Sequence, residues 1–378
     1  MKHADIIQWV LLLLISLWHP PGWESALAQS VDFSGQLSVW IQENHDDGRT
    51  THLLGGRYIP RLSMNMDLTG ERFIDAEVSV NAFWYADTRM DNDQYDADFH
   101  RAVVRYATPQ TTTRIGLQKI NFGPARILRS LRWFDRLDPT DPQQFTDGVW
   151  GGLFRYNALN NANAWLWILY GNEDLKGMDQ LPTSEDRPEF GGRFQYPVPA
   201  GEIAVTAHTR QVGGDRPAPD EFTENRYALD GSWDVTVGTW FEAVLVQQTT
   251  PAIHDNYLHL ATLGADYTFS IGNGLHLTLE HFVAAAGGHP LDTGETVHAT
   301  AFSLDYPLNI LDNVTALGFY NWDDNTHAQH VEWRRTYDRV TFSLSGFSYP
   351  QAPGDTAMFS STSSVEGVGA QFMIIFNH

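Results

Sequence analysis

The chain has 378 residues, contains no cysteine and carries a formal net charge of −22. The lack of cysteine excludes disulfides, thiolate metal sites and a thiol nucleophile. The acidic balance argues against nucleic acid as a partner, because the phosphates of nucleic acids bind to basic surfaces.

The first residues predict a secretory signal peptide over residues 1–28. A positive start at Lys2 precedes the apolar run Val10–Trp18, and the small-residue site Ala26–Ala28 follows. This order is typical of a signal peptide, and the run is shorter than the roughly 20 residues of a membrane-spanning helix. We therefore predict cleavage after Ala28 and export of residues 29–378. An uncleaved N-terminal anchor is the alternative.

The rest of the chain alternates apolar and polar residues with a period of two. Ile74–Trp84 is apolar at even positions and mostly polar at odd ones, and Tyr58–Leu68 and Tyr257–Phe269 follow the same pattern. The longest later apolar run, Ala164–Tyr170, is too short for a spanning helix. Alternation suits strands between lipid and a wet lumen. We predict an all-β fold: one antiparallel transmembrane β-barrel over residues 29–378. A soluble β-sandwich, the alternative, would be unusually large.

Short and long links alternate between the predicted strands, as is typical of outer-membrane barrels. They predict about 18 strands, or 16 if the Trp322–Arg339 hairpin is merged. The last strand, Gly367–Phe376, resembles the C-terminal assembly signal of outer-membrane proteins. The short links are Thr69–Arg72, Thr108–Thr111, Asn157–Asn163, Pro197–Gly201, Asp234–Gly238, Ser270–Gly274, Pro307–Asn313 and Arg335–Arg339. The long links are Glu43–Gly56, Asp87–Asp96, Ile120–Asp147, Gly171–Pro188, Gln211–Glu221, Thr249–Asn256, Ala286–Glu295, Trp322–Gln329 and Tyr349–Ser364.

The long link at residues 120–147 contains a row of arginines. If the stretch is helical, their spacing of three or four residues places the guanidinium groups near one face. A link of this length predicts a loop that folds into the barrel and constricts the lumen. Arginines there could bind carboxylate, phosphate or sulfate groups of a solute. The candidate constriction and solute-contact residues are Arg114, Lys119, Arg126, Arg129, Arg132, Asp135, Arg136, Asp138 and Asp141.

The alternative for this row is a structural role. The arginines would pair with Asp135, Asp138, Asp141 and Asp147 and only hold the loop in place. The two roles are compatible.

Three motifs within Arg114–Asp174 carry a resemblance to known proteins: R-x-G-x-Q-K-x-N-F-G-P-A-R, W-F-D-R-L-D-P-x-D-P and LFRYNALNNANAWLWILYGNED. The segment resembles porin-type outer-membrane proteins, and is similar to the alginate-export group and to related uncharacterised large barrels. The resemblance implies an 18-stranded barrel with an arginine-rich lumen. It does not identify a substrate.

Motifs for enzymes are weak. The chain has no G-x-S-x-G elbow, no H-E-x-x-H and no glycine-rich phosphate loop. His327 and His330 beside Asp323 and Asp324 could bind a transition metal, and Asp91–Asp98 has some features of a calcium loop. Ordinary polar links explain both segments more simply. We expect no enzymatic activity and no cofactor.

Together these features predict an outer-membrane porin for passive diffusion of small hydrophilic solutes, with anionic or sugar-like molecules as candidates. Its other expected partners are outer-membrane lipids and lipopolysaccharide. The alternative is a structural barrel that acts as a sleeve or scaffold for a partner protein. The sequence leaves the oligomeric state open.

Overall fold

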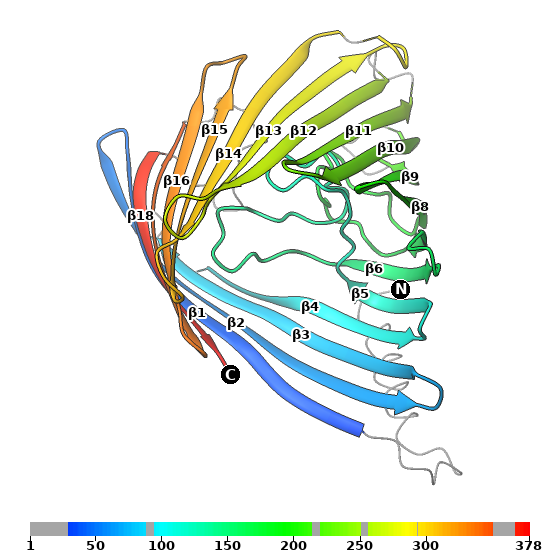
Figure 1. The fold of residues 1–378 in the computed structure, drawn as a ribbon, viewed down its shortest axis with the longest axis horizontal. Coiled ribbons are helices and arrows are strands. Elements are labelled where there is room, and N and C mark those ends of the chain that lie inside the picture. Colours follow the sequence, from blue (N-terminus) through cyan, green and yellow to red (C-terminus); the bar gives the residue numbers. More distant parts are fainter. Residues whose placement is uncertain (1–28, 88–93, 214–219, 251–255, 293, 351–366) are drawn as a thin grey trace.

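The alternating segments form one closed antiparallel barrel. The computed structural model describes residues 29–87, 94–213, 220–250, 256–292, 294–350 and 367–378. Its 18 strands form a single sheet that closes because β1 pairs with both β2 and β18 (Figure 1). The strands are β1 (Gln29–Asp46), β2 (Arg49–Leu68), β3 (Arg72–Asp87), β4 (Gln94–Ala107), β5 (Thr111–Gln118), β6 (Val149–Asn157), β7 (Asn163–Leu169), β8 (Glu189–Val198), β9 (Gly201–Val212), β10 (Phe222–Asp234), β11 (Gly238–Thr249), β12 (Tyr257–Phe269), β13 (Leu275–Gly287), β14 (Thr296–Pro307), β15 (Asp312–Asn321), β16 (His327–Thr336), β17 (Val340–Tyr349) and β18 (Gly367–Asn377).

The predicted inward and outward faces are confirmed. In β12, the side chain of Leu263 is 65% exposed on the outside of the barrel, whereas its neighbour Thr262 is fully buried on the lumen side. In β3, Ser79 is buried while Val78 lies on the opposite face of the strand. Successive residues of a strand point to opposite sides, so the period of two in the sequence becomes an apolar outside and a polar inside.

The predicted links agree with the structure at nearly every position. Trp322–Arg339 contains the separate strand β16, so the barrel has 18 strands and not 16. The expected long link Glu43–Gly56 is wrong, because β1 and β2 stay paired as far as Asp46 and Arg49. Asp47 and Gly48, both with positive φ, close this hairpin tightly. The polar residues of this segment suggested a loop, but they form paired strands, because the hydrogen bonds between strands join backbone groups and do not require apolar side chains.

Some sequence predictions fall outside the described residues. The signal peptide at residues 1–28 does so entirely, and several long links do so in part. Within the described ranges, no helix has the length and apolar character needed to cross a bilayer.

The main hydrophobic cluster lies inside the barrel. Figure 1 shows residues 119–148, which connect β5 to β6, crossing the interior. Their buried side chains Phe122, Leu131 and Phe134 pack with residues of the wall such as Trp167 and Phe282. This segment, which we call the lumen loop, therefore fills part of the space that the barrel encloses.

Candidate functional site

The lumen loop is irregular along its length. No helix forms between residues 119 and 148, so the condition under which the arginine row would share one helical face is not met. The physical reason lies in the backbone. The N–H groups that an α-helix would use internally are bonded instead to side chains of the barrel wall.

Two carboxylates of the barrel wall bind the first half of the lumen loop, at residues 125–131. Glu280 of β13 accepts hydrogen bonds from the backbone N–H groups of Arg126 (2.6 Å), Ile127 (2.9 Å) and Leu128 (2.6 Å). Glu242 of β11 accepts from the N–H groups of Ala125 (3.0 Å) and Leu131 (2.8 Å). Both carboxylates are buried, and five backbone donors thus converge on two acceptors.

A hydroxyl pair and a glycine complete this contact. Thr262 of β12 donates to the carbonyl oxygen of Leu128 (2.6 Å), and its hydroxyl lies 2.8 Å from the Ser130 hydroxyl. Gly123 has a φ of +93°, and a Cβ at this position would lie 2.3 Å from the carboxylate of Glu242. Only glycine allows this close approach.

The second half of the lumen loop reaches the other side of the barrel. The side chain of Gln143 donates to Gln36 of β1 (2.9 Å) and accepts from Arg57 of β2 (3.0 Å). Arg334 of β16 donates to the carbonyl oxygen of Pro142 (3.2 Å), and Arg101 of β4 donates to that of Thr146 (2.9 Å). The loop thus spans the lumen and is fixed at both sides.

Two arginines of the predicted row form ion pairs. Arg129 lies 2.7 Å from Asp135, with both side chains buried, and it also donates to the side chain of Asn121 (3.1 Å). Arg126 lies 2.5 Å from Asp266 of β12 and 4.9 Å from the ring centre of Trp240. The structural alternative therefore applies to Arg129 and Asp135.

Asp138 and Asp141 do not pair with the arginine row. Asp138 accepts from the backbone N–H and hydroxyl of Thr140 (2.8 and 2.7 Å). Asp141 accepts from the backbone N–H groups of Gln143 (2.9 Å) and Phe145 (3.0 Å). Burial raises the pKa of Asp141 above its ordinary value. Both aspartates shape turns beside their prolines.

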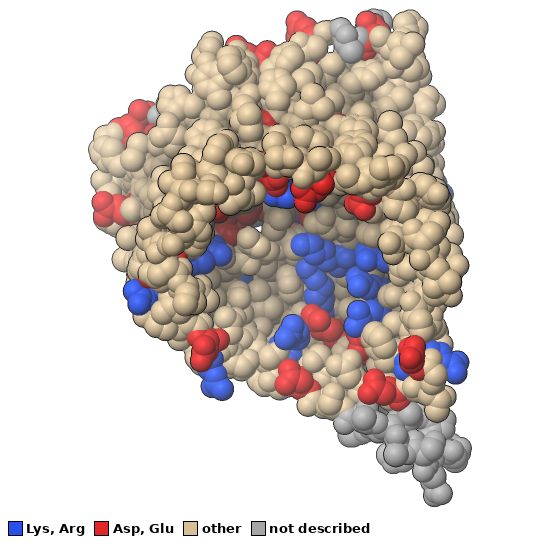
Figure 2. Space-filling view, in the orientation of Figure 1, with Lys and Arg blue, Asp and Glu red and all other residues tan. Residues whose placement is uncertain are grey.

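Seven further cations of the loop and the wall form no ion pair with a carboxylate in the described part of the chain. In the loop, burial lowers the pKa of Arg132 and of Lys119 from their ordinary values. The Nε atom of Arg132 is buried and has no hydrogen-bond partner. Figure 2 shows Lys and Arg side chains gathered inside the hollow of the barrel. The members of this set, the free cations, are Arg57, Arg101, Arg114, Lys119, Arg132, Arg136 and Arg155.

The link between β7 and β8 also contacts the lumen loop. The backbone N–H of Met178 donates to the carbonyl oxygen of Arg132 (2.9 Å). This second link is held by Asp179, which pairs with Arg210 (2.6 Å) and Arg226 on the wall. Lys176 pairs with Glu189 at 2.9 Å. With Glu224, which pairs with Arg210 at 2.8 Å, three acids face three bases, so this buried cluster adds little net charge.

Sequence reasoning missed Glu242 and Glu280. Each is a single acid in an alternating strand, and nothing local distinguishes it from any other lumen-facing acid. His327 and His330, which could have formed a metal pair, lie apart, since His330 is buried on one face of β16 and His327 is exposed on the other. Within the described ranges, no group of three or more His, Asp or Glu could hold a metal ion.

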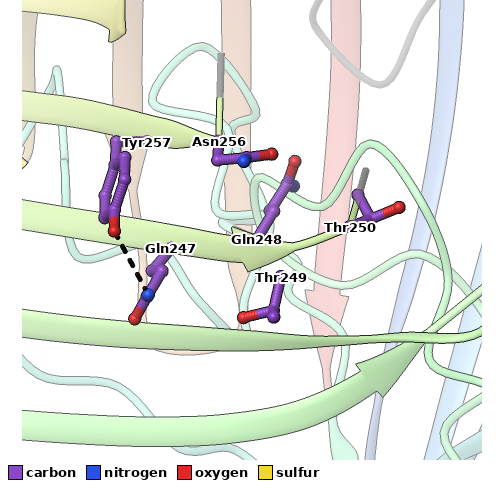
Figure 3. Close-up of a pocket in the computed structure, with 6 residues that line it drawn as sticks. All are labelled: Gln247, Gln248, Thr249, Thr250, Asn256 and Tyr257. Carbon is purple, nitrogen blue, oxygen red and sulfur yellow. Dashed lines mark hydrogen bonds between the residues drawn. The ribbon is translucent and has the colours of Figure 1, made fainter. Parts of the chain in front are cut away.

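A small recess lies at the end of β11 and β12, away from the free cations. It encloses about 260 Å³ and contains a hydrogen bond from Gln247 to the Tyr257 hydroxyl of 3.3 Å (Figure 3). Its described lining is polar and uncharged. The lining residues are Gln247, Gln248, Thr249, Thr250, Asn256 and Tyr257.

No model of a known protein family matches the chain, and no characterised protein matches it by sequence. Solved structures do match. OccD3 (OpdP) of Pseudomonas aeruginosa has a TM-score of 0.60 and 11% identity, covering 93% of this chain and 92% of that one. OccAB4 of Acinetobacter baumannii has a TM-score of 0.59 and 7% identity, with coverages of 95% and 100%. An anion-selective porin from Comamonas acidovorans has a TM-score of 0.52 and 11% identity, with coverages of 93% and 100%. At these identities the similarity concerns the fold, and the fold of this chain is that of outer-membrane porins.

Proposed function

We propose that this protein is an outer-membrane channel for passive diffusion of small hydrophilic solutes, and that it favours anions. The observation that carries the proposal is the combination of a loop across the lumen with seven free cations around it. The loop narrows the passage, and cations such as Arg132 and Lys119 form no ion pair with a carboxylate of the described chain.

The same loop favours a channel over a sleeve for a partner protein. It contacts β11 and β13 on one side and β1, β2, β4 and β16 on the other. A polypeptide threaded through the barrel would have to displace it. Small solutes need only the space beside it.

Guanidinium groups suit solutes that carry carboxylate, phosphate or sulfate groups, because the planar fork can donate two parallel hydrogen bonds. Arg114 of β5 and Arg155 of β6 lie on adjacent strands of the wall, and Lys119 follows directly on β5. The anion-selective porin with the same fold adds support. Within the arginine row we assign solute contact to Arg132 and Arg136, and a structural role to Arg129.

The remaining parts of the proposal follow from this function. Residues 1–28 act as a cleaved signal peptide, and residues 120–147 form the constriction. The outer surface contacts membrane lipid and lipopolysaccharide, and the chain performs no catalysis. The relation to the alginate-export group, with its arginine-rich lumen, remains a prediction from the motifs.

Swelling of proteoliposomes tests the proposal. We expect a small sugar acid to enter faster than the neutral sugar of the same size, and R132S/R136S to remove most of that advantage. R49S/R339S, which removes one arginine at the start of β2 and one from the β16–β17 turn, serves as the matched control. Failure of the wild-type protein to admit either solute would contradict the channel. An unchanged preference in R132S/R136S would contradict the assignment of these arginines.

A further inference from the structure

The lumen-facing acids Glu242 and Glu280 do not line the passage, because both are buried beneath the lumen loop. We infer that they are positioning residues: they hold residues 125–131 against the wall and thereby set the width of the passage. The inference rests on the proposed function for its consequence on permeation, and on the hydrogen bonds alone for the attachment of the loop.

The acceptor capacity of Glu280 is fully used. Besides three consecutive backbone N–H groups of the loop, it accepts from the indole Nε1 of Trp240 at 3.0 Å. A carboxylate offers about four lone-pair sites and has no donor. A carboxylate therefore suits a site in which the four groups bonded to it are all donors. Hydrogen bonds to a charged acceptor are also stronger than bonds between neutral groups.

The wall residues that bond to the loop stand side by side. Glu242, Thr262 and Glu280 come from the adjacent strands β11, β12 and β13. Glu242 stands opposite Thr262, and Glu280 stands opposite Gly264. Gly264 has no side chain, which leaves room for the Trp240 ring that donates to Glu280, since a Cβ there would lie 2.1 Å from the indole nitrogen.

The loop has no substitute for these acceptors. Residues 125–131 form no helix, so their N–H groups lack intrahelical partners. A buried N–H without an acceptor is costly, and loss of both carboxylates would leave five such N–H groups without an acceptor at once. A glutamine in place of each glutamate keeps the size but has one acceptor oxygen, and its amide N–H₂ faces donors. Glu to Gln should therefore loosen the loop without creating a cavity.

Thiol labelling tests the attachment directly. The chain has no cysteine, so Ser130→Cys introduces a single thiol at a fully buried position of the loop. We expect a hydrophilic maleimide to label this thiol about tenfold faster or more in E242Q/E280Q than in the parent, because local opening exposes it. Asp305→Asn is the matched control: Asp305 is a β14 acid that, among the described residues, accepts hydrogen bonds from the hydroxyls of Ser303 and Thr315 and from no loop backbone. Heat-modifiable migration in SDS gels verifies folding of each variant.

Single-channel recording in the same variants tests the consequence. We expect E242Q/E280Q to show a higher and noisier conductance, with E242D/E280D between it and the parent. Equal labelling in parent and E242Q/E280Q would overturn the attachment. Faster labelling with unchanged conductance would overturn the role in setting the passage. A parent protein that folds but never conducts would refute the proposed function, while the labelling comparison would still decide the attachment.

Discussion

Arg129 and Arg132 lie three residues apart in the lumen loop, and their guanidinium groups have opposite surroundings. Arg129 is buried against Asp135 at 2.7 Å. Arg132 has no carboxylate partner in the described chain, and burial lowers its pKa. The first arginine is part of the loop's own structure, and the second is the one to which we assign solute contact.

The two positions should therefore respond differently to the same substitution. Arg129→Gln leaves Asp135 buried without its counter-charge, which typically costs about 3–5 kcal/mol. We expect faster hydrogen exchange throughout residues 119–148. Arg132→Gln should leave exchange nearly unchanged and move the reversal potential in a salt gradient towards cations. The reverse pattern, with a stable Arg129→Gln loop and an unchanged potential in Arg132→Gln, would contradict this division of roles.

Lys119 should make anion preference depend on pH. Burial lowers the pKa of its ammonium group from the ordinary 10.5, so it loses its proton, and its positive charge, at a lower pH than a free lysine. Anion preference should therefore decline as pH rises through the alkaline range below 10.5. Lys119→Arg should keep the preference over that range, because guanidinium stays protonated. Identical reversal-potential profiles for both proteins would show that Lys119 does not contribute.

At the scale of elements, strands were predictable and the lumen loop was predictable only in part. The alternation in β12 is a local property of the backbone, so its faces follow from the sequence alone. The loop's existence follows from its length. Its path does not, because Ala125 bonds to an acid 117 residues further along the chain. Long-range acceptors replaced the helical bonds that arginine spacing suggested.

Gly123 tests the fit between the loop and β11. Ala at this position would need a φ of +93° and would place its Cβ 2.3 Å from the Glu242 carboxylate. Such strain typically costs about 1–3 kcal/mol. We expect Gly123→Ala to accelerate proteolysis within the loop while the barrel stays intact. Gly152→Ala, whose Cβ would meet nothing closer than 4.0 Å, should behave as the parent protein. Equal cleavage of both variants would contradict the close contact.

The outer face of β12 tests the orientation of the strands in the membrane. Leu263 lies midway along the strand and is 65% exposed, whereas Thr268 lies on the lumen side near one end. Leu263→Arg should cost about 2–4 kcal/mol in folding into bilayers, and Thr268→Arg should cost much less. Urea titration of folding into vesicles measures both. Equal costs would mean that Leu263 does not face lipid.

At the scale of the whole molecule, the proposed function gives the net charge and the charge at the passage opposite signs. The chain carries −22 overall, and summed charge of that sign would favour cations. Some acids inside the barrel do not face the passage: Asp135 is paired with Arg129, and Glu280 is buried beneath the loop. In the proposed channel, the free cations lie where the loop narrows the lumen. Charges count most there, because the effective dielectric is lower than at the mouth.

The reversal potential of single channels in a potassium chloride gradient tests this account most directly. We predict stepwise conductance with a reversal potential displaced towards the equilibrium potential of chloride. In R132S/R136S the reversal potential should shift towards the equilibrium potential of potassium. The shift should shrink in high salt, where the Debye length falls to about 3 Å at 1 M. Absence of conductance steps, or a potassium preference of equal size in the wild-type protein and R132S/R136S, would contradict the account.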